Sequence, residues 1–425
     1  MHNESVWRLT ATEAAELIQA GKLTSEALTG ACLERIASRE AVIEAWETLD
    51  PDGALSQAQM RDREAGSFPL QGIPVAVKDL IDVAGLPTRY GSPIHAHAGA
   101  AASDAACVAA ARRAGAVILG KTVTTEFAGA EPGKTHNPLN LAHTPGGSSS
   151  GSVACVADGM APLAFGTQTA GSIIRPAAYC GIVGFKPSFG WMDLTGVGVF
   201  APSLDTLGLF SRSVADVARF YAALTGRPQT PAPAGGPVRI GRLSGPPVAA
   251  ASPLAEQAIA VSLTKLSGHG AEIVDVAPPI PLVTLARAQL TVMAYETNQS
   301  LLQAQQEHPG LLSPKTRELL ALGASISRTE YEASLGLAGQ ARQSFAAAME
   351  GVDALIMPPT SGIAPYGLQD TGDPAFCRVW SLLGFPALTL PVLRDESGLS
   401  VGIQLVAAPA GDDRLLAVAH LAGRV

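Results

Sequence analysis

One stretch decides how this chain is interpreted. It runs from His143 to Pro187 and is HTPGGSSSGSVACVADGMAPLAFGTQTAGSIIRPAAYCGIVGFKP. It contains two serine-bearing loops bracketed by glycines, at 146–152 and 166–172, and the apolar, alanine-rich run between them predicts a buried helix. Glycine adopts backbone conformations that other residues resist and lets a ligand approach closely. A serine between such glycines can present its hydroxyl beside converging backbone N–H groups, as acyl transfer requires. What activates the serine must come from elsewhere in the chain.

The composition predicts a large buried core. Of the 425 residues, 47% are hydrophobic and only 16% are charged, which does not fit a disordered chain. Length alone favours two or three domains. The five cysteines are odd in number and lack CxxC spacing, so we expect buried free thiols rather than disulfides or a zinc site.

The charge pattern limits the expected partners. The net charge is −8 and no cluster of lysine or arginine is present, so we expect neither nucleic acid nor a membrane surface as a partner. The N-terminus lacks the pattern of a signal peptide, and no apolar run is long enough to span a bilayer. A cytoplasmic location is expected.

Upstream of the serine loops, the chain begins with helical patterns and then changes to a strand. Thr10 to Glu13 form a capping-box sequence, and Thr24 or Ser25 can cap a second helix, so residues 1–60 are expected to be scaffold helices packed on the core. Alternating β-branched residues then predict a strand over 73–77 that ends at Lys78. On this pattern alone, such a lysine usually reaches solvent or pairs with a carboxylate.

The remaining patterns alternate between helix and strand, which favours an α/β fold. A helix over 103–114 precedes a strand over 116–119, and 120–127 resembles a loop entering a helix. Residues 225–250 are rich in proline and glycine and mark either a domain boundary or an internal connection. Helices are expected near 253–267, over 281–350, over 375–384 and from 412, with strands at 272–276, 354–357, 387–392 and 399–406.

Four catalytic templates can be compared with these loops. A phosphate-binding loop needs a lysine directly after its glycines, and neither loop has one. A Ser-His-Asp triad is disfavoured because only His143 lies near the loops in sequence, and a metal site is disfavoured because His95 and His97 have no third ligand in register. The fourth template uses Lys78 as the base, because burial on an apolar strand lowers the pKa of a lysine and a bridging serine can relay the proton.

These residues resemble the amidase signature family of serine hydrolases. The resemblance is dense from Gly72 to Gly208, through GIPVAVKD at 72–79, PGGSSSGS at 145–152, GTQTAGSIIRPA at 166–177 and SLD at 203–205, and it extends weakly to the end of the chain. It implies one large α/β domain over 61–425, with a mixed twisted sheet covered by helices on both faces and with 225–250 as an internal connection. This replaces the two-domain expectation from length.

The resemblance also implies a Ser–cis-Ser–Lys triad. Ser172 takes the nucleophile position, Ser148 the bridging position after a cis peptide bond, and Lys78 the base position. The backbone N–H groups of Thr169, Ala170, Gly171 and Ser172 would form the oxyanion hole. No metal or other cofactor is implied.

Other residues near the triad have both structural and functional interpretations. Arg175 is expected either to lock the loop in an ion pair, with Asp205 or another acid, or to clamp the substrate. Gly147 and Trp191 are further candidate substrate contacts. Ser149, Ser150 and Ser152 are expected to hydrogen-bond the loop or cap the next helix, and Asp79, Asp205 and Gln168 to fix loops. Phe127, Phe200, Trp380 and Phe385 are expected in the core, with an aromatic pocket as the alternative.

The resulting expectation is a cofactor-free hydrolase of the amide bond of a small molecule, acting through an acyl-enzyme. Carbamate (urethane) or ester cleavage uses the same parts. A glutamine-dependent amidotransferase subunit is the second alternative, and a non-catalytic scaffold is disfavoured because all three triad positions are present. The expected partner is the amide substrate, with a homodimer left open.

Overall fold

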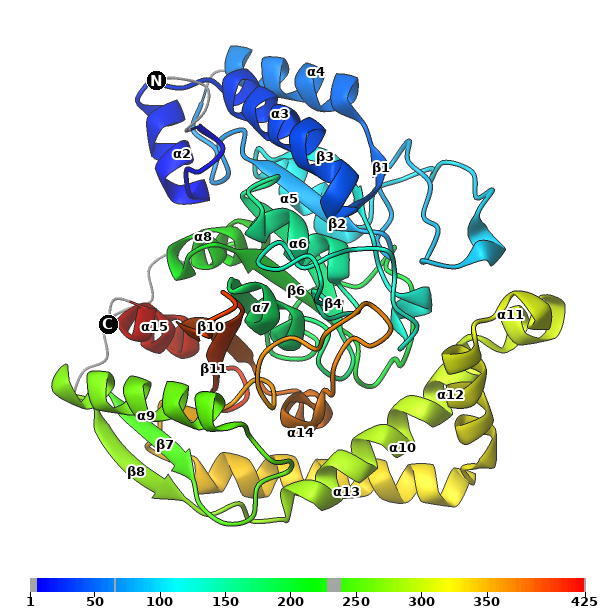
Figure 1. Ribbon diagram of the computed structural model, residues 1–425, viewed down its shortest axis with the longest axis vertical. Coiled ribbons are helices and arrows are strands. Elements are labelled where there is room, and N and C mark those ends of the chain that lie inside the picture. Colours follow the sequence, from blue (N-terminus) through cyan, green and yellow to red (C-terminus); the bar gives the residue numbers. More distant parts are fainter. Residues whose placement is uncertain (1–5, 65, 228–237, 424–425) are drawn as a thin grey trace.

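A computed structural model describes residues 6–64, 66–227 and 238–423. Its centre is one mixed sheet of 11 strands in the order β1-β3-β2-β4-β6-β5-β10-β11-β9-β7-β8 (Figure 1). The strands are β1 (Trp46–Leu49), β2 (Pro74–Lys78), β3 (Val117–Thr122), β4 (Leu163–Gln168), β5 (Val183–Lys186), β6 (Thr206–Ser211), β7 (Arg239–Leu243), β8 (Glu272–Val276), β9 (Ala354–Met357), β10 (Ala387–Arg394) and β11 (Ser400–Val406). A single sheet of this extent makes the molecule one α/β domain.

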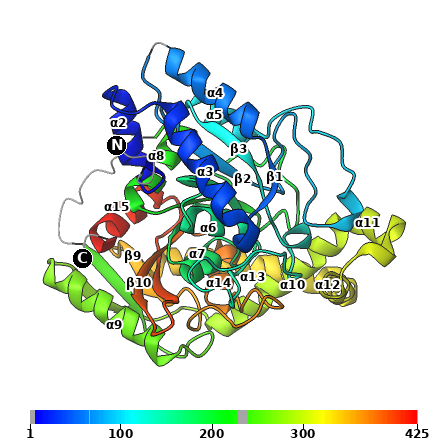
Figure 2. The same ribbon diagram turned by 45° about the horizontal axis from the view of Figure 1, so that its top comes forward.

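Helices surround the sheet (Figure 2). They are α2 (Ala11–Gln19), α3 (Ser25–Ile43), α4 (Pro51–Arg63), α5 (Ala106–Arg113), α6 (Ser150–Ala157), α7 (Ile174–Cys180), α8 (Val214–Thr225), α9 (Pro253–Gly268), α10 (Leu282–Ser300), α11 (Leu302–Glu307), α12 (Pro314–Ser325), α13 (Arg328–Ala348), α14 (Ala375–Leu383) and α15 (Asp412–Gly423). The expected capping box is present at Thr10 and Glu13, and Thr24 caps α3. No described helix is long and apolar enough to cross a membrane.

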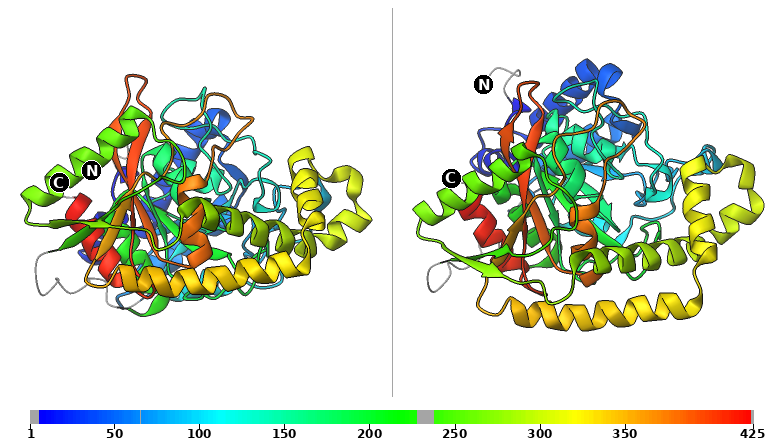
Figure 3. Two further views of the ribbon diagram at one scale, coloured as in Figure 1. Left: turned by 90° about the horizontal axis from the view of Figure 1, so that it is seen from below. Right: turned by 60° about the horizontal axis from the view of Figure 1, so that its bottom comes forward.

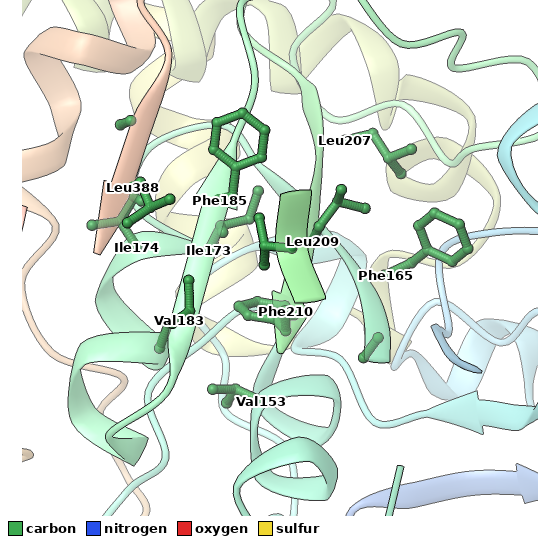
Figure 4. Packing of buried hydrophobic residues seen from close by; sticks show 14 of the residues in the cluster. Val153, Phe165, Ile173, Ile174, Val183, Phe185, Leu207, Leu209, Phe210 and Leu388 are labelled. Carbon is green, nitrogen blue, oxygen red and sulfur yellow. The ribbon is translucent and has the colours of Figure 1, made fainter. Parts of the chain in front are cut away.

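The two faces of the sheet are covered by different helices. Successive residues of a strand point to opposite faces. Phe165 and Phe185 contact Phe220 and Tyr221 of α8 on one face. On the other face, a Cβ at Gly184 would lie 2.6 Å from Ala177 Cβ of α7, so this glycine lets α7 pack directly on the backbone. The core around these strands is dense and apolar (Figure 4).

Three neighbouring strands place polar residues at one edge of the sheet. Strand β2 runs parallel to both β3 and β4. Their carboxyl ends therefore meet at the same edge, where open α/β sheets bind ligands. Lys78, Lys121 and Thr167 lie at or next to these ends.

A group of long helices covers the region facing this edge. Helices α10 and α13 run side by side along the base of the molecule, and α12 rises from their end (Figure 3). Helix α14 packs against both α10 and α13. These helices come from the part of the chain that follows strand β8, far in sequence from the serine loops.

Several local expectations differ from the structure. The run between the serine loops forms helix α6 and also the central strand β4, which includes Gly166 to Gln168 of the second loop. Residues 120–122 continue strand β3 and are not a loop, because they pair with β1 and β2. Residues 1–60 also supply strand β1 in addition to helices. Of the connection expected at 225–250, residues 228–237 lie outside the described part of the chain.

Candidate active site

Lys78 and Ser148 lie in direct contact although 70 positions separate them. Lys78 ends strand β2, and its Nζ atom is 2.7 Å from Ser148 Oγ and 2.8 Å from Thr167 Oγ1 on β4. All three side chains are buried, and the Gly147–Ser148 peptide bond is cis. The expected contact between the lysine and the bridging serine is therefore present.

The environment of Lys78 favours a neutral amine. Burial lowers the pKa of Lys78 well below its ordinary value, because the charged form loses its hydration, and the negative charge of Asp205 only partly opposes this effect. Among the described residues no carboxylate forms an ion pair with Lys78. A neutral amine within 2.7 Å of a hydroxyl can accept its proton.

Ser172 lies beside unpaired backbone donors. The segment 169–172 follows strand β4 and precedes helix α7. Its four backbone N–H groups donate no hydrogen bond to any other residue in the described ranges, and Ser172 Oγ likewise has no partner there, Ser148 included. A hydroxyl next to several free N–H groups can attack a carbonyl carbon, and those groups can then donate hydrogen bonds to the oxyanion of the tetrahedral intermediate.

Buried polar side chains hold this segment in place. Gln168 Oε1 accepts hydrogen bonds from the N–H groups of Ile173 and Ile174, which fixes the turn after Ser172. Asp205 Oδ1 accepts a 2.5 Å hydrogen bond from Thr169 Oγ1. Burial raises the pKa of Asp205 to about 6, against the lowering effect of the hydrogen bonds that it accepts. Gln168 and Asp205 thus fix loops, as expected.

Arg175 forms no ion pair with Asp205 or with any other acid of the described chain. Its Nη2 atom donates to Gly147 O at 2.7 Å and to Thr371 Oγ1 at 3.2 Å, and Nη1 donates to Gly372 O. The guanidinium therefore links the first serine loop to the segment at 371–372, mainly through main-chain carbonyls. Arg175 thus links the loop as expected, but the expected ion pair is wrong: its donors go to main-chain carbonyls and Thr371, while Asp205 accepts from Thr169 and from the N–H groups at 200–201.

A second buried lysine supports the same edge of the sheet. Lys121 Nζ lies 2.8 Å from Asp79 Oδ1, and both side chains are almost fully sealed from solvent. Lys121 also donates to Thr88 Oγ1 and Pro87 O. Asp79 accepts from the N–H of Arg89, so this pair ties the chain after β2 to β3.

Ser172 opens into a cavity of about 480 Å³. Part of its wall is apolar and comes from Phe200, from Leu290 and Met293 of α10, and from Leu319 and Leu322 of α12. Its polar wall consists of Thr169, Arg175, Lys315, Glu318, Asp370, Thr371 and Arg378. The cavity thus combines a hydroxyl nucleophile candidate with several charged groups.

The other expected site residues have different positions. Gly147 is packed between Thr125 and Thr371 and is not among the residues lining the cavity. Trp191 is not brought to this cavity, because its ring lies under the Arg227 guanidinium, 3.8 Å from its centroid, beside a different hollow. Of the four aromatic residues considered, Phe200 lines the cavity, whereas Phe127, Trp380 and Phe385 pack elsewhere in the core.

The neighbouring serines contact protein groups. Ser149 Oγ lies 3.3 Å from Thr167 O, Ser150 Oγ 3.4 Å from Val123 O, and Ser152 Oγ 2.8 Å from Phe165 O. The expectation was bonding within the loop or capping of the next helix. Instead Ser149 and Ser152 contact carbonyls of strand β4, Ser150 contacts the carbonyl just after β3, and Ser149 does not cap α6 through its side chain. Cys180 is a buried free thiol whose pKa is raised by burial.

Three site residues were missed in the sequence. Thr167 lies within the second serine loop, and its place on a strand parallel to β2 could have indicated a contact with Lys78. Gln289 Nε2 donates to Thr169 O at 3.1 Å, and Arg378 Nη1 donates to Gln289 Oε1 at 2.5 Å. These two residues come from α10 and α14, and no local pattern there points to the serine loops.

Known proteins resemble the chain over nearly its whole length. A family model described as Amidase matches residues 27–416. A glutamyl-tRNA(Gln) amidotransferase subunit of Roseiflexus sp. (strain RS-1) is 33% identical, covering 98% of this chain and 96% of the relative. A structure described as a vestigial protein complex revealing the evolutionary origins of an s-triazine catabolic enzyme has a TM-score of 0.89 and 28% identity, covering 97% and 98% of the two chains. The native peptide amidase from Stenotrophomonas maltophilia has a TM-score of 0.81 and 29% identity, covering 98% and 96%.

Proposed function

The chain belongs to the amidase family, and on this premise we propose that it hydrolyses the C–N bond of a small amide through an acyl-enzyme on Ser172. The observation that carries the proposal is the buried Lys78, which contacts Ser148 and has no carboxylate partner among the described residues. A lysine with a lowered pKa is a general base near neutral pH. Lys121, also sealed from solvent, is paired with Asp79. Lys186 is sealed without an ion pair in the described chain but donates to the Pro187 carbonyl, so contact with the hydroxyl of Ser148 is what distinguishes Lys78.

The first half-reaction forms the ester. Ser172 Oγ attacks the amide carbonyl carbon while its proton passes to Ser148 Oγ, and the proton of Ser148 passes to Lys78 Nζ. The carbonyl oxygen becomes an oxyanion and accepts hydrogen bonds from the free N–H groups of segment 169–172. When the C–N bond breaks, Lys78 returns its proton through Ser148 to the leaving amine.

The second half-reaction uses water. The water oxygen attacks the ester carbon, and one proton of the water passes through Ser148 to Lys78. The second oxyanion accepts hydrogen bonds from the same N–H groups. The C–O bond to Ser172 then breaks, the acid leaves, and the proton returns to Ser172 Oγ. Esters and carbamates fit the same steps: an ester changes the leaving group to an alcohol, and a carbamate also changes the group that is bound to Ser172.

A glutamine-dependent amidotransferase subunit is the second candidate function. It is favoured by the Roseiflexus relative, whose name is that of an amidotransferase component and whose match covers nearly both chains. The two candidates differ in what accepts the released ammonia and in the assembly required. Light scattering of the purified chain, with and without other proteins of its host, separates a monomer or homodimer from one component of a larger complex.

The test compares ammonia release by the wild-type chain and by Ser172→Ala. We expect the chain alone to release ammonia from several small primary amides and Ser172→Ala to release none above background. Activity confined to glutamine and dependent on a partner would favour the second candidate. An active Ser172→Ala variant would remove the assignment of the nucleophile.

A further inference from the structure

Arg378 is a cation in the cavity of Ser172. It lies on α14, which packs against α10. Its half-buried side chain lines the cavity together with Ser172 and Thr169. Burial lowers the pKa of Arg378, yet a guanidinium remains protonated at any physiological pH. A positive charge is therefore held next to the loop that carries Ser172.

The guanidinium of Arg378 has most of its hydrogen-bonding capacity free. Nη1 donates to Gln289 Oε1, and within the described ranges this is the only hydrogen bond of its side chain. No acid in those ranges lies within ion-pair distance of it. No nitrogen of Arg378 is both buried and without a partner, so its free N–H groups are accessible. These groups belong to the planar fork with which a guanidinium binds a carboxylate through two parallel hydrogen bonds.

The acids near the cavity form no ion pair with this cation in the described chain. Arg175 is a second guanidinium that forms no ion pair within the described ranges, although main-chain carbonyls accept hydrogen bonds from it. Asp370 accepts a hydrogen bond from the N–H of Gly372, and Asp373, whose charge acts on Arg378, accepts from the N–H of Ala375. Lys315 and Glu318 of α12, both in the cavity wall, carry opposite charges.

We propose that Arg378 binds a carboxylate of the substrate, so that the preferred substrates are small amides with a free carboxylate a few bonds from the cleaved carbonyl. This inference rests on the proposed function of Ser172. The carboxylate must lie close to the cleaved carbonyl because Arg378 is near the loop of Ser172. Gln289 alone bridges Arg378 and the carbonyl of Thr169, three residues before Ser172. A cavity of about 480 Å³ holds a substrate of that size together with its leaving group.

Arg378 could instead only position Gln289 and, through it, the loop at Thr169. The two roles differ in which ligands they affect. Loss of a positioning residue lowers the binding affinity of charged and neutral amides by the same factor. Loss of a carboxylate partner lowers the affinity of the charged amides only. The ratio of the two affinities therefore separates the roles.

The experiment is calorimetric titration of the Ser172→Ala protein, which cannot consume the ligand. Succinamate and glutaramate are compared with butyramide and pentanamide, in which a methyl group replaces the carboxylate. We expect at least one carboxylate to bind about tenfold or more tightly than its neutral counterpart, as a charged hydrogen-bonded pair contributes. Adding Arg378→Met should abolish this preference, whereas Arg342→Met, which removes an arginine with a single hydrogen bond outside the cavity, should keep it.

Three outcomes overturn the inference: neither carboxylate is preferred, the preference survives Arg378→Met, or Arg378→Met weakens both ligand types equally. Circular dichroism and the urea midpoint confirm that each variant is folded. Failure of the proposed function is read separately, from turnover by Ser172→Ala, so either idea can fail while the other stands.

Discussion

Thr167→Val removes one of the two hydrogen-bond partners of Lys78 while keeping the shape of the side chain. In the resting enzyme the neutral amine of Lys78 lies 2.8 Å from Thr167 Oγ1, a contact that contributes about 0.5–1.5 kcal/mol. When Lys78 gains its proton, the same contact becomes a bond from a charged donor and contributes about 1.5–3 kcal/mol. The difference, about 1–1.5 kcal/mol, stabilises only the protonated stage and predicts a fall in kcat of about 5–13-fold.

The same substitution changes the pH dependence. Thr167 Oγ1 accepts from Nζ and so favours the ammonium over the amine; its removal lowers the pKa of Lys78 further. Because the reaction needs the neutral amine, activity rises with pH through the pKa of Lys78, and this acid limb moves to lower pH in Thr167→Val.

The assay is the pH profile of kcat for amide hydrolysis by the wild type, Thr167→Val and a control. Thr389→Val is the matched control, since Thr389 is also a buried strand threonine that donates to a carbonyl, Ile403 O at 2.9 Å. An unchanged acid limb in Thr167→Val, or an equal shift in Thr389→Val, would refute Lys78 as the base.

Three further substitutions test the surroundings of the site. Arg175→Met should lower the free energy of unfolding by about 1.5–3 kcal/mol in urea titrations, because buried carbonyls at Gly147 and Gly372 lose a charged donor; an unaltered midpoint would contradict the linking role. Lys121→Met should lower it by about 3–5 kcal/mol, since Asp79 is left as an unpaired buried charge, and adding Asp79→Asn should restore much of the loss. Asp205→Asn should change the pH dependence of stability. Folded Asp205 binds its proton below about pH 6, but the unfolded carboxyl does so only below about 3.8, so wild-type stability falls as pH rises between these values. The Asn variant should lack that fall, and an identical slope in both proteins would argue against the raised pKa.

Local patterns predicted the elements whose signals lie within a few residues. The capping box at Thr10 marks the start of α2, and the alternation over 73–77 marks β2 with Lys78 at its end. Strand β4 was missed because its residues, LAFGTQ, are buried on both faces and show no alternation. Its glycine, Gly166, suggested a loop, but in the sheet it makes room for Phe210.

Only the site residues that lie in sequence motifs could be predicted. The contact between Lys78 and Ser148 was predicted from a family resemblance, and the structure gives the distance between the two side chains. Gln289 and Arg378 come from helices of ordinary amphipathic sequence, so their place beside Thr169 follows from the packing of α10 and α14 and has no local signature. Trp191 was expected to contact the substrate, but it does not line the cavity of Ser172. Its ring stacks with Arg227, a residue 36 positions downstream that only the fold brings near.

The most direct test of the central claim is to identify the residue that becomes acylated. The protein is treated with a fluorophosphonate ester, which forms a stable bond with an activated serine, and the adduct is located by peptide mass spectrometry. We predict one adduct, on Ser172, that is absent in Ser172→Ala and forms far more slowly in Lys78→Met. An adduct on Ser148, or labelling of Ser172 at an unchanged rate in Lys78→Met, would contradict the assignment of nucleophile and base.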